Sequence, residues 1–187
     1  MSSFQLKGGI GSASRCVAMA DGTTHTVGTL VLANYGRQPQ LVLAGHAVGE
    51  RLAALQAAKE ASEPEKGSII IVVATDAPLD ARQLRRLALR AGAGLARTGS
   101  VYGHGSGDLV LAFSTAYTVP DRADRPMPAV AMLHDTRLDG LFQAAADSTE
   151  QAILHALWRA TPVTGRDGNH RAALGELLPA SSLSPLA

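Results

Sequence analysis

The segment SIIIVVAT at residues 68–75 constrains the fold of this chain more strongly than any other stretch. After Ser68 it is a continuous run of mostly β-branched, apolar residues that is too short for an ordinary helix. A run of this kind is typical of a β-strand whose two faces are both covered by other parts of the protein. Because the polar segment at 62–67 precedes it, the strand is expected to begin at Ser68 itself.

Helices and further strands surround this segment in an order that indicates a layered α/β fold. Asp80 and Gln83 approximate a capping box, and the apolar residues that follow at helical spacing predict a helix that ends at 98–99. The same spacing predicts helices over 49–60 and 135–160. Additional strands are expected at 25–34, 41–44 and about 109–119. The periodicity leaves open whether the strands form one sheet or two.

The composition limits the classes of protein to which this chain can belong. The 187 residues are most simply one domain, and 17 Lys and Arg against 16 Asp and Glu argue against a nucleic-acid surface or a polybasic membrane patch. No apolar run reaches the roughly 20 residues that span a bilayer, and residues 1–11 do not resemble a signal peptide. We therefore expect a soluble, cytoplasmic protein, or a periplasmic one if its true N-terminus lies upstream. Cys16 is the one cysteine, which excludes an intrachain disulfide.

Ser68 admits two interpretations. A serine at the start of a strand is usually a structural residue that follows a turn. The alternative depends on the segment before it, because breakage of the peptide bond between Gly67 and Ser68 would give one residue both a hydroxyl and a free α-amine. Such an amine has an ordinary pKa of about 8 and can act as a base for the hydroxyl, as in enzymes with an N-terminal nucleophile.

The loop GHGSGD at 103–108 is a second candidate site. Its glycines would let the backbone approach a ligand closely, but no lysine or helix follows as in a phosphate-binding loop. The Gly-x-Ser-x-Gly spacing of a nucleophile elbow is also absent around Ser106. Ser106 and Asp108 lie two residues apart at a strand start, so both side chains are expected on one face, where they could act together. The alternative is a plain glycine loop with a solvated aspartate.

Asn34 stands at the end of the expected strand 25–34 and could donate its side-chain amide to an oxyanion. An asparagine that precedes a glycine turn is more often a turn former. The six histidines are scattered without ligand spacing, and no cysteine cluster joins them, so no metal or other cofactor is expected. His104 lies so near Ser106 and Asp108 in the chain that a serine–histidine–aspartate triad would be sterically poor.

Several segments taken together resemble one family, the DmpA-like L-aminopeptidase/D-esterase and β-peptidyl aminopeptidase family (the P1 family). The resemblance runs over nearly the whole chain, with the motifs in the family's order. The segments that carry it are FQLKGGIGSASR (4–15), LVLANYGR (30–37), GSIIIVVATDAPLDARQLRRLALRAGAGLARTGS (67–100), SGDLVLAFSTA (106–116), AAADSTEQAILHALWRAT (144–161) and TGRDG (164–168).

The resemblance implies a fold and a reaction. Family members have an αββα sandwich of the DmpA and ornithine-acetyltransferase type, and their precursor cleaves itself before a serine that matches Ser68, which then becomes the nucleophile. Ser106 and Asp108 match the second serine and the acid of the catalytic group, and Asn34 matches the side-chain oxyanion donor. The implied activity is that of a self-processing serine aminopeptidase that releases N-terminal residues from short peptides, amino-acid amides or esters.

The resemblance also implies that this chain differs from the family at its N-terminal end. Family members carry a substantial stretch before the KGGIG segment, so we expect this chain to lack the N-terminal part of the fold. Residues 1–67 would be a shortened α-chain and 68–187 a complete β-chain. Two alternatives stay open: a truncated relative that keeps the fold but is non-catalytic or partner-dependent, and an acyl transferase of the ornithine-acetyltransferase type. Because the family tends to form homo-oligomers, we expect a homo-oligomer here.

Overall fold

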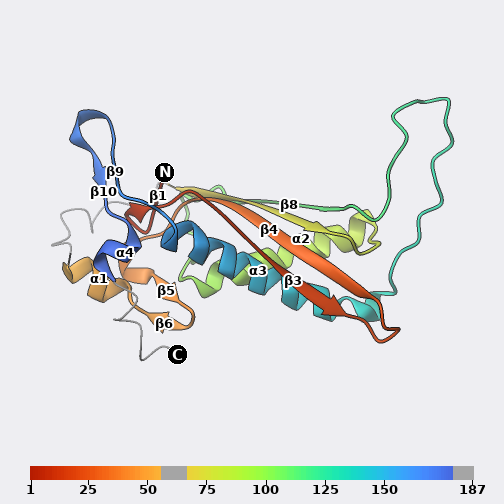
Figure 1. Cartoon of the computed structure of the whole chain (residues 1–187), viewed down its shortest axis with the longest axis horizontal. Coiled ribbons are helices and arrows are strands. Elements are labelled where there is room, and N and C mark those ends of the chain that lie inside the picture. The colour runs from red at the N-terminus through yellow and green to blue at the C-terminus, as the bar shows by residue number, and fades with distance from the viewer. Residues whose placement is uncertain (56–66, 179–187) are drawn as a thin grey trace.

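The computed structural model describes residues 1–55 and 67–178 of the chain. Its centre is a four-stranded sheet in the order β3-β4-β7-β8, in which β7 pairs antiparallel with β4 and parallel with β8 (Figure 1). These strands are Ile10–Ala18 (β3), Thr24–Asn34 (β4), Ser68–Thr75 (β7) and Leu109–Ser114 (β8). The predicted layered α/β architecture is therefore confirmed.

Strand β7 begins at Ser68 and ends at Thr75, as the sequence predicts. Its β-branched residues favour an extended backbone, because a branch at Cβ restricts the side chain in a helix. Ile69, Ile71 and Val73 are fully buried in the core, whereas the residues between them point to the opposite face. Ser68 is thus the first residue of a strand that has a neighbour on each side.

Two helices cover one face of the sheet, α2 (Ala81–Arg97) and α3 (Asp139–Trp158). Helix α2 begins with the predicted capping box, in which the Asp80 carboxylate accepts from Gln83 N–H at 2.7 Å and the Gln83 side chain accepts from Asp80 N–H at 3.3 Å. It ends where expected, since Gly99 takes a φ of +97° directly after the cap residue.

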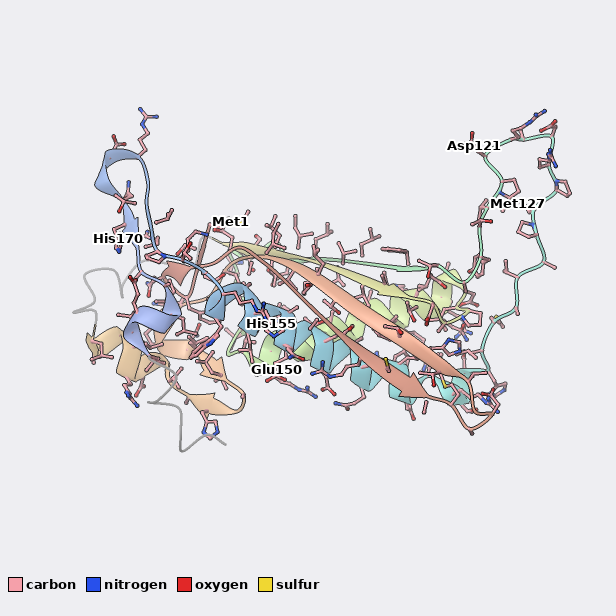
Figure 2. The ribbon with its side chains drawn as sticks, viewed as in Figure 1. Met1, Asp121, Met127, Glu150, His155 and His170 are labelled. Atoms are coloured by element: carbon pink, nitrogen blue, oxygen red, sulfur yellow. The ribbon has the colours of Figure 1, made fainter. Side chains whose placement is uncertain are left out.

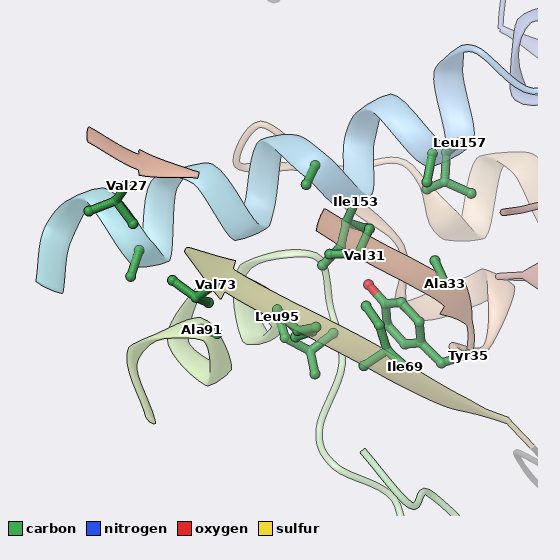
Figure 3. Packing of buried hydrophobic residues seen from close by; sticks show 14 of the residues in the cluster. Val27, Val31, Ala33, Tyr35, Ile69, Val73, Ala91, Leu95, Ile153 and Leu157 are labelled. Carbon is green, nitrogen blue, oxygen red and sulfur yellow. The ribbon is translucent and has the colours of Figure 1, made fainter. Parts of the chain in front are cut away.

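The core lies between the sheet and these helices (Figure 3). Helix α3 approaches β3 so closely that a Cβ on Gly11 would lie 1.9 Å from the carbonyl oxygen of Ala152. A glycine at this position therefore permits the contact between strand and helix. The hydroxyls of Thr29 and Ser148 form a hydrogen bond of 2.7 Å inside the core, which removes the cost of burying them unpaired.

No helix in the described chain has both the length and the apolar composition needed to cross a membrane. Short strands, helices and 3-10 turns complete the described chain. They are β1 (Ser2–Ser3), β2 (Leu6–Lys7), η1 (Gln38–Gln40), β5 (Val42–Leu43), β6 (His46–Ala47), α1 (Gly49–Leu55), η2 (Asp135–Arg137), β9 (Val163–Thr164), η3 (Arg166–Gly168), β10 (His170–Arg171) and α4 (Leu174–Leu177).

Two strand boundaries differ from the sequence expectations, and the end of one predicted helix is not tested. The strand expected to run to about 119 ends at Ser114, where the Ser114 hydroxyl donates to the Ala77 carbonyl at 2.6 Å and the chain leaves the sheet. The strand expected over 41–44 shrinks to the two residues of β5. The helix expected over 49–60 is described as far as Leu55, and the remainder of that prediction lies outside the described residues.

The expectation that β7 is covered on both faces is wrong for the described part of the chain. On the face away from the helices, Ile70 is 44% exposed, and its neighbours Leu109 and Leu111 on β8 are 59% and 58% exposed. Of the four layers of an αββα sandwich, the described residues therefore form two, one sheet and one layer of helices. The apolar pattern shows which faces avoid water, but no local pattern reveals whether a second layer is present.

Candidate functional site

Ser68 and Asn34 lie opposite each other at one end of the sheet. They are partners in the antiparallel pairing of β7 with β4. Residues directly opposite in such a pair place their side chains on the same face. Since the alternate residues Ile69 and Ala33 are fully buried, the side chains of Ser68 and Asn34 face away from the helices, and both residues are partly exposed.

Gly67 carries the chain past the end of β4 to Ser68. A Cβ on Gly67 would lie 2.0 Å from the carbonyl oxygen of Asn34 and 2.9 Å from Cα of Tyr35. Backbone atoms cannot yield as a flexible side chain can, so a larger residue would have to displace the strand. The glycine therefore holds the peptide bond that precedes Ser68 directly against the end of β4, beside Asn34.

The loop at 103–108 brings a backbone donor to the Ser68 hydroxyl. The parallel pairing that sets Ile70 beside Leu109 places this loop next to the start of β7. Gly107 N–H donates a hydrogen bond of 2.9 Å to Ser68 Oγ. In the described part of the chain this is the one hydrogen bond made by the Ser68 hydroxyl, so the hydroxyl proton stays available for transfer to a base.

Ser106 and Asp108 form a bonded pair next to Ser68. The Ser106 hydroxyl donates to Asp108 Oδ1 at 2.6 Å, and the same oxygen accepts from Ile69 N–H at 3.1 Å. Their sequence spacing predicts that the two side chains lie together, and they do so in the loop just before β8. Because Ile69 directly follows Ser68, the carboxylate holds the backbone that carries the Ser68 hydroxyl.

The side-chain amide of Asn34 is oriented by the N-terminal hairpin. Asn34 Oδ1 accepts from the backbone N–H of Ser2, in β1, at 3.0 Å. The carbonyl end of the amide is thus turned towards β1, so the Nδ2 end points elsewhere. No acceptor for Asn34 Nδ2 is found among the residues that the structure describes, which leaves this donor available to an oxygen near Ser68.

Sequence reasoning missed Tyr102, which belongs to the same loop region. Its hydroxyl donates to the Gly92 carbonyl on α2, and its backbone takes a φ of +53°. Burial, followed by the nearby Asp108 carboxylate, raises the pKa of Tyr102 above its ordinary value, since both disfavour the tyrosinate. The glycines at 103 and 105 signal an unusual loop, but no sequence feature reveals that Tyr102 ties this loop to α2.

The predicted residues Asn34, Gly67, Ser68, Ser106 and Asp108 are therefore brought to one end of the sheet. His104, exposed in the same loop, takes no part in the Ser106–Asp108 bond. Across residues 1–55 and 67–178 no three His, Cys, Asp or Glu side chains gather as metal ligands would. What the site offers is a serine hydroxyl that accepts from one backbone N–H, one carboxylate and one free amide donor, an arrangement suited to acyl transfer.

Comparison with known proteins supports this chemistry. The model of Peptidase family S58 matches residues 1–171. The chain is 42% identical over 179 residues to the β-peptidyl aminopeptidase BapA of Sphingosinicella microcystinivorans, and the match covers 90% of this chain and 45% of the relative. The chain thus spans less than half the length of that curated relative.

Solved structures that resemble this chain also belong to aminopeptidases. The chain resembles a β-aminopeptidase from a Burkholderia species with a TM-score of 0.82 and 39% identity, over 100% of this chain and 52% of the other. It resembles the L-aminopeptidase D-Ala-esterase/amidase of Ochrobactrum anthropi, a prototype for the serine aminopeptidases and a variant of the Ntn hydrolase fold, with a TM-score of 0.86 and 37% identity. That match covers 100% of this chain and 50% of the other, and the shared architecture is the DmpA-like α/β fold.

Proposed function

The chain belongs to peptidase family S58, and from this premise we propose that it is a self-processing serine aminopeptidase with Ser68 as its nucleophile. The observation that carries the proposal is the hydrogen bond of 2.9 Å from Gly107 N–H to Ser68 Oγ, at the point where Asn34 lies opposite. A serine that only started a strand would need neither a loop 39 residues away to hold its oxygen nor an amide with a free donor beside it.

The first reaction is cleavage of the bond between Gly67 and Ser68. Ser68 Oγ attacks the Gly67 carbonyl carbon and transfers its proton to the Ser68 nitrogen as the C–N bond breaks, which gives an ester. Water then hydrolyses this ester to a Gly67 carboxylate and a free Ser68 hydroxyl. Asn34 Nδ2 donates to the carbonyl oxygen while it carries negative charge, a contribution of roughly 3 kcal/mol for one such donor.

The second reaction uses the amine that cleavage releases. An α-amine with an ordinary pKa of about 8 is partly unprotonated at neutral pH, so it can accept the proton of Ser68 Oγ directly or through water. Ser68 Oγ then attacks the amide or ester carbon of a substrate, the amine or alcohol leaves with the proton, and water hydrolyses the acyl-enzyme. Ser106 and Asp108 hold the backbone at Ile69 during these steps.

The substrate class follows from the relatives. Proteins of this family that resemble the chain are named as β-peptidyl aminopeptidase, β-aminopeptidase and L-aminopeptidase D-Ala-esterase/amidase. We therefore assign short peptides, amino-acid amides and esters with a free N-terminal residue as substrates. We also infer that the protein forms a homo-oligomer.

Labelling with a serine-reactive sulfonyl fluoride tests the nucleophile without requiring a substrate. Ser68 Oγ is expected to displace fluoride and to carry the sulfonyl group in a peptide map by mass spectrometry. Ser68→Ala should abolish the label, and Ser114→Ala, which lies at the far end of the sheet, should keep it. A label that is absent from Ser68 or equal on other serines would refute the proposal.

A further inference from the structure

The segment 99–108, which we call the site loop, leads from the end of α2 to the start of β8. It carries two groups of the candidate site. Gly107 N–H donates to Ser68 Oγ at 2.9 Å, and the Asp108 carboxylate accepts from Ile69 N–H at 3.1 Å. Both contacts require the loop to stay in one position, so whatever holds the loop determines how steadily these groups face the serine.

Both ends of the site loop are anchored, whereas its middle is exposed. At the α2 end, the hydroxyls of Thr98 and Tyr35 form a buried hydrogen bond of 2.8 Å, and the Thr98 carbonyl accepts from Val42 N–H at 3.1 Å. At the β8 end, strand pairing with β7 fixes the chain. Between these anchors Val101 is 68% exposed and Tyr102 is 50% exposed. Burial of apolar surface therefore contributes little to the position of the middle of the loop.

The Tyr102 side chain ties the middle of the site loop to α2. Its hydroxyl donates a hydrogen bond to the carbonyl oxygen of Gly92. A helical carbonyl can accept this second bond because its oxygen has two lone pairs. Within residues 1–55 and 67–178, this is the one hydrogen bond that joins residues 101–105 to another helix or strand. The position of the exposed middle of the loop therefore depends on Tyr102.

Gly92 leaves the space that this contact needs. The three atoms nearest to a Cβ added at Gly92 all belong to Tyr102, with the hydroxyl oxygen at 2.5 Å, Cζ at 3.5 Å and Cε1 at 4.0 Å. A glycine inside a helix such as α2 is less stable than an alanine. The absence of a side chain at position 92 thus disfavours the helix, while it admits the tyrosine hydroxyl to the helix backbone.

The backbone of Tyr102 gives a second, independent indication. Its φ of +53° lies in the left-handed region, which is disfavoured for a bulky side chain. A residue stays in such a conformation only where its other contacts hold it there. A turn follows directly, in which the Gly103 carbonyl accepts from Ser106 N–H at 2.8 Å. The strained residue and this turn together direct the chain to Gly107, and the bond to Gly92 compensates for the strain.

We propose that Tyr102 is a positioning residue, whose bond to Gly92 holds the site loop so that Gly107 N–H stays on Ser68 Oγ. Tyr102 acts on the serine through the loop and not by direct contact. Its effect on a reaction rate rests on the proposed function, because only a reactive Ser68 benefits from a fixed donor. One neutral hydrogen bond changes the population of the bonded loop by about two- to tenfold, and the cleavage rate follows that population.

Tyr102→Phe, which removes only the hydroxyl, tests the proposal with two readouts. The first is hydrogen exchange of Gly107 N–H, followed by nuclear magnetic resonance on chains in the same processing state. The second is the rate of self-cleavage, from time courses of fragment formation. Exchange of Gly107 N–H should become about two- to tenfold faster, because the loop leaves Ser68 Oγ more often. The cleavage rate should decrease by a similar factor.

Tyr117→Phe is the matched control. The Tyr117 hydroxyl also donates to a backbone carbonyl, that of Leu79, at 2.6 Å. The chain that follows Tyr117 carries Asp121 and Met127, which Figure 2 shows far from Met1, at the end of the molecule remote from the hairpin that borders the site. This variant loses a bond of the same kind and should leave both readouts unchanged.

Gly92→Ala separates positioning from support of the fold. Alanine favours the helix, so the Tm should stay the same or rise. The new methyl group would displace the Tyr102 hydroxyl, so cleavage should nevertheless become about two- to tenfold slower. In the Tyr102→Phe background the oxygen is gone and the nearest ring atom is 3.5 Å away, so Gly92→Ala should have no further effect on the rate. A residue that only supported the fold would lose Tm and rate together.

Three outcomes would overturn the positioning role. One is exchange of Gly107 N–H, or cleavage by a chain that cleaves itself, that Tyr102→Phe leaves unchanged. Another is a Tyr117→Phe variant that is as slow as Tyr102→Phe. The third is an effect of Gly92→Ala on the rate that is equally large in the Tyr102→Phe background. An unmodified chain that stays uncut would refute the proposed function, and the exchange of Gly107 N–H would still decide the role of Tyr102.

Discussion

The backbone N–H of Gly107 donates a hydrogen bond of 2.9 Å to Oγ of Ser68 across 39 positions of sequence. Parallel pairing of β7 and β8 creates this contact, since it aligns the start of one strand with the loop that leads into the other. The bond holds a lone pair of the hydroxyl and leaves its proton free, which is the state an attacking oxygen needs.

Removal of this donor should slow self-cleavage. Gly107→Pro deletes the N–H, and we expect a decrease of about tenfold in the rate, the equivalent of one hydrogen bond of ordinary strength. Gly107→Ala keeps the N–H, and its Cβ would lie 3.4 Å from Ser68 Oγ, so its rate should stay near that of the unmodified chain. Rates come from time courses of fragment formation on denaturing gels, and equal rates for both variants would contradict this role.

Asp108 should matter more than Ser106. The carboxylate accepts from both Ile69 N–H and the Ser106 hydroxyl, whereas Ser106 makes one of these two bonds. Bonds to a charged group are stronger than neutral ones, so Asp108→Ala should lower the cleavage rate by about 10- to 100-fold, and Ser106→Ala by less. A Ser106→Ala variant that is slower than Asp108→Ala would show that the hydroxyl acts on the reaction directly.

Two substitutions of Asn34 separate catalysis from structure. Asn34→Asp keeps the oxygen that accepts from Ser2 N–H, while Asn34→Ala removes it, and both delete the Nδ2 donor. If Nδ2 stabilises the oxyanion, both variants should cleave about 100-fold more slowly. A loss confined to Asn34→Ala would instead indicate that the bond to Ser2 only supports the fold. Thermal unfolding of each variant provides the structural control.

Asp135 gives a prediction for stability against pH. Hydrogen bonds from Arg82, at 2.7 and 2.9 Å, and then from Gln83 hold the pKa of Asp135 well below its ordinary value of 3.8. A lowered pKa in the folded state stabilises the fold above the unfolded pKa, and this stabilisation is lost as the pH falls through the folded pKa. Asp135→Asn should therefore lower the Tm at pH 7.

Comparison of Asp135→Asn with the unmodified chain at several pH values tests the direction of this pH dependence. The difference in Tm between Asp135→Asn and the unmodified chain should shrink as the pH falls below about 4, because the unfolded chain then takes up a proton at Asp135 that the bonded carboxylate of the folded state resists. Asp124→Asn, which breaks an exposed pair with Arg122, is the control and should shift the Tm little at either pH. A difference for Asp135→Asn that is constant with pH would contradict the assigned cause.

Local sequence predicts the elements of this fold well where one residue type dominates the outcome. The apolar run at 68–75 defines β7 to the residue, and the capping box at Asp80 defines the start of α2. The end of β8 was not predictable in the same way. The apolar pattern continues past Ser114, but hydrogen bonds from Ser114 and Thr115 to Ala77 and Thr75 turn the chain away.

The candidate site was likewise predictable only where its contacts are local in the sequence. Spacing in the sequence brings Ser106 to Asp108, a local relationship, whereas strand pairing sets Asn34 opposite Ser68 and Gly107 against its hydroxyl. The donors from Gly107, Ile69 and Ser2 are backbone groups that every residue type but proline possesses, so the sequence carries no signal for them. The exposure of Ile70, Leu109 and Leu111 on the sheet face opposite α2 and α3 was not predicted, because an apolar strand has the same local pattern whether or not a second layer covers it.

The intact mass of the purified chain under denaturing conditions tests the role of Ser68 most directly. If Ser68 is the nucleophile, we expect two fragments, residues 1–67 and 68–187, that meet between Gly67 and Ser68, together with a single uncut chain for Ser68→Ala. Ser114→Ala should be cut like the unmodified chain. A single uncut mass for the unmodified chain, or the same two fragments from Ser68→Ala, would contradict the assignment of Ser68 as the nucleophile.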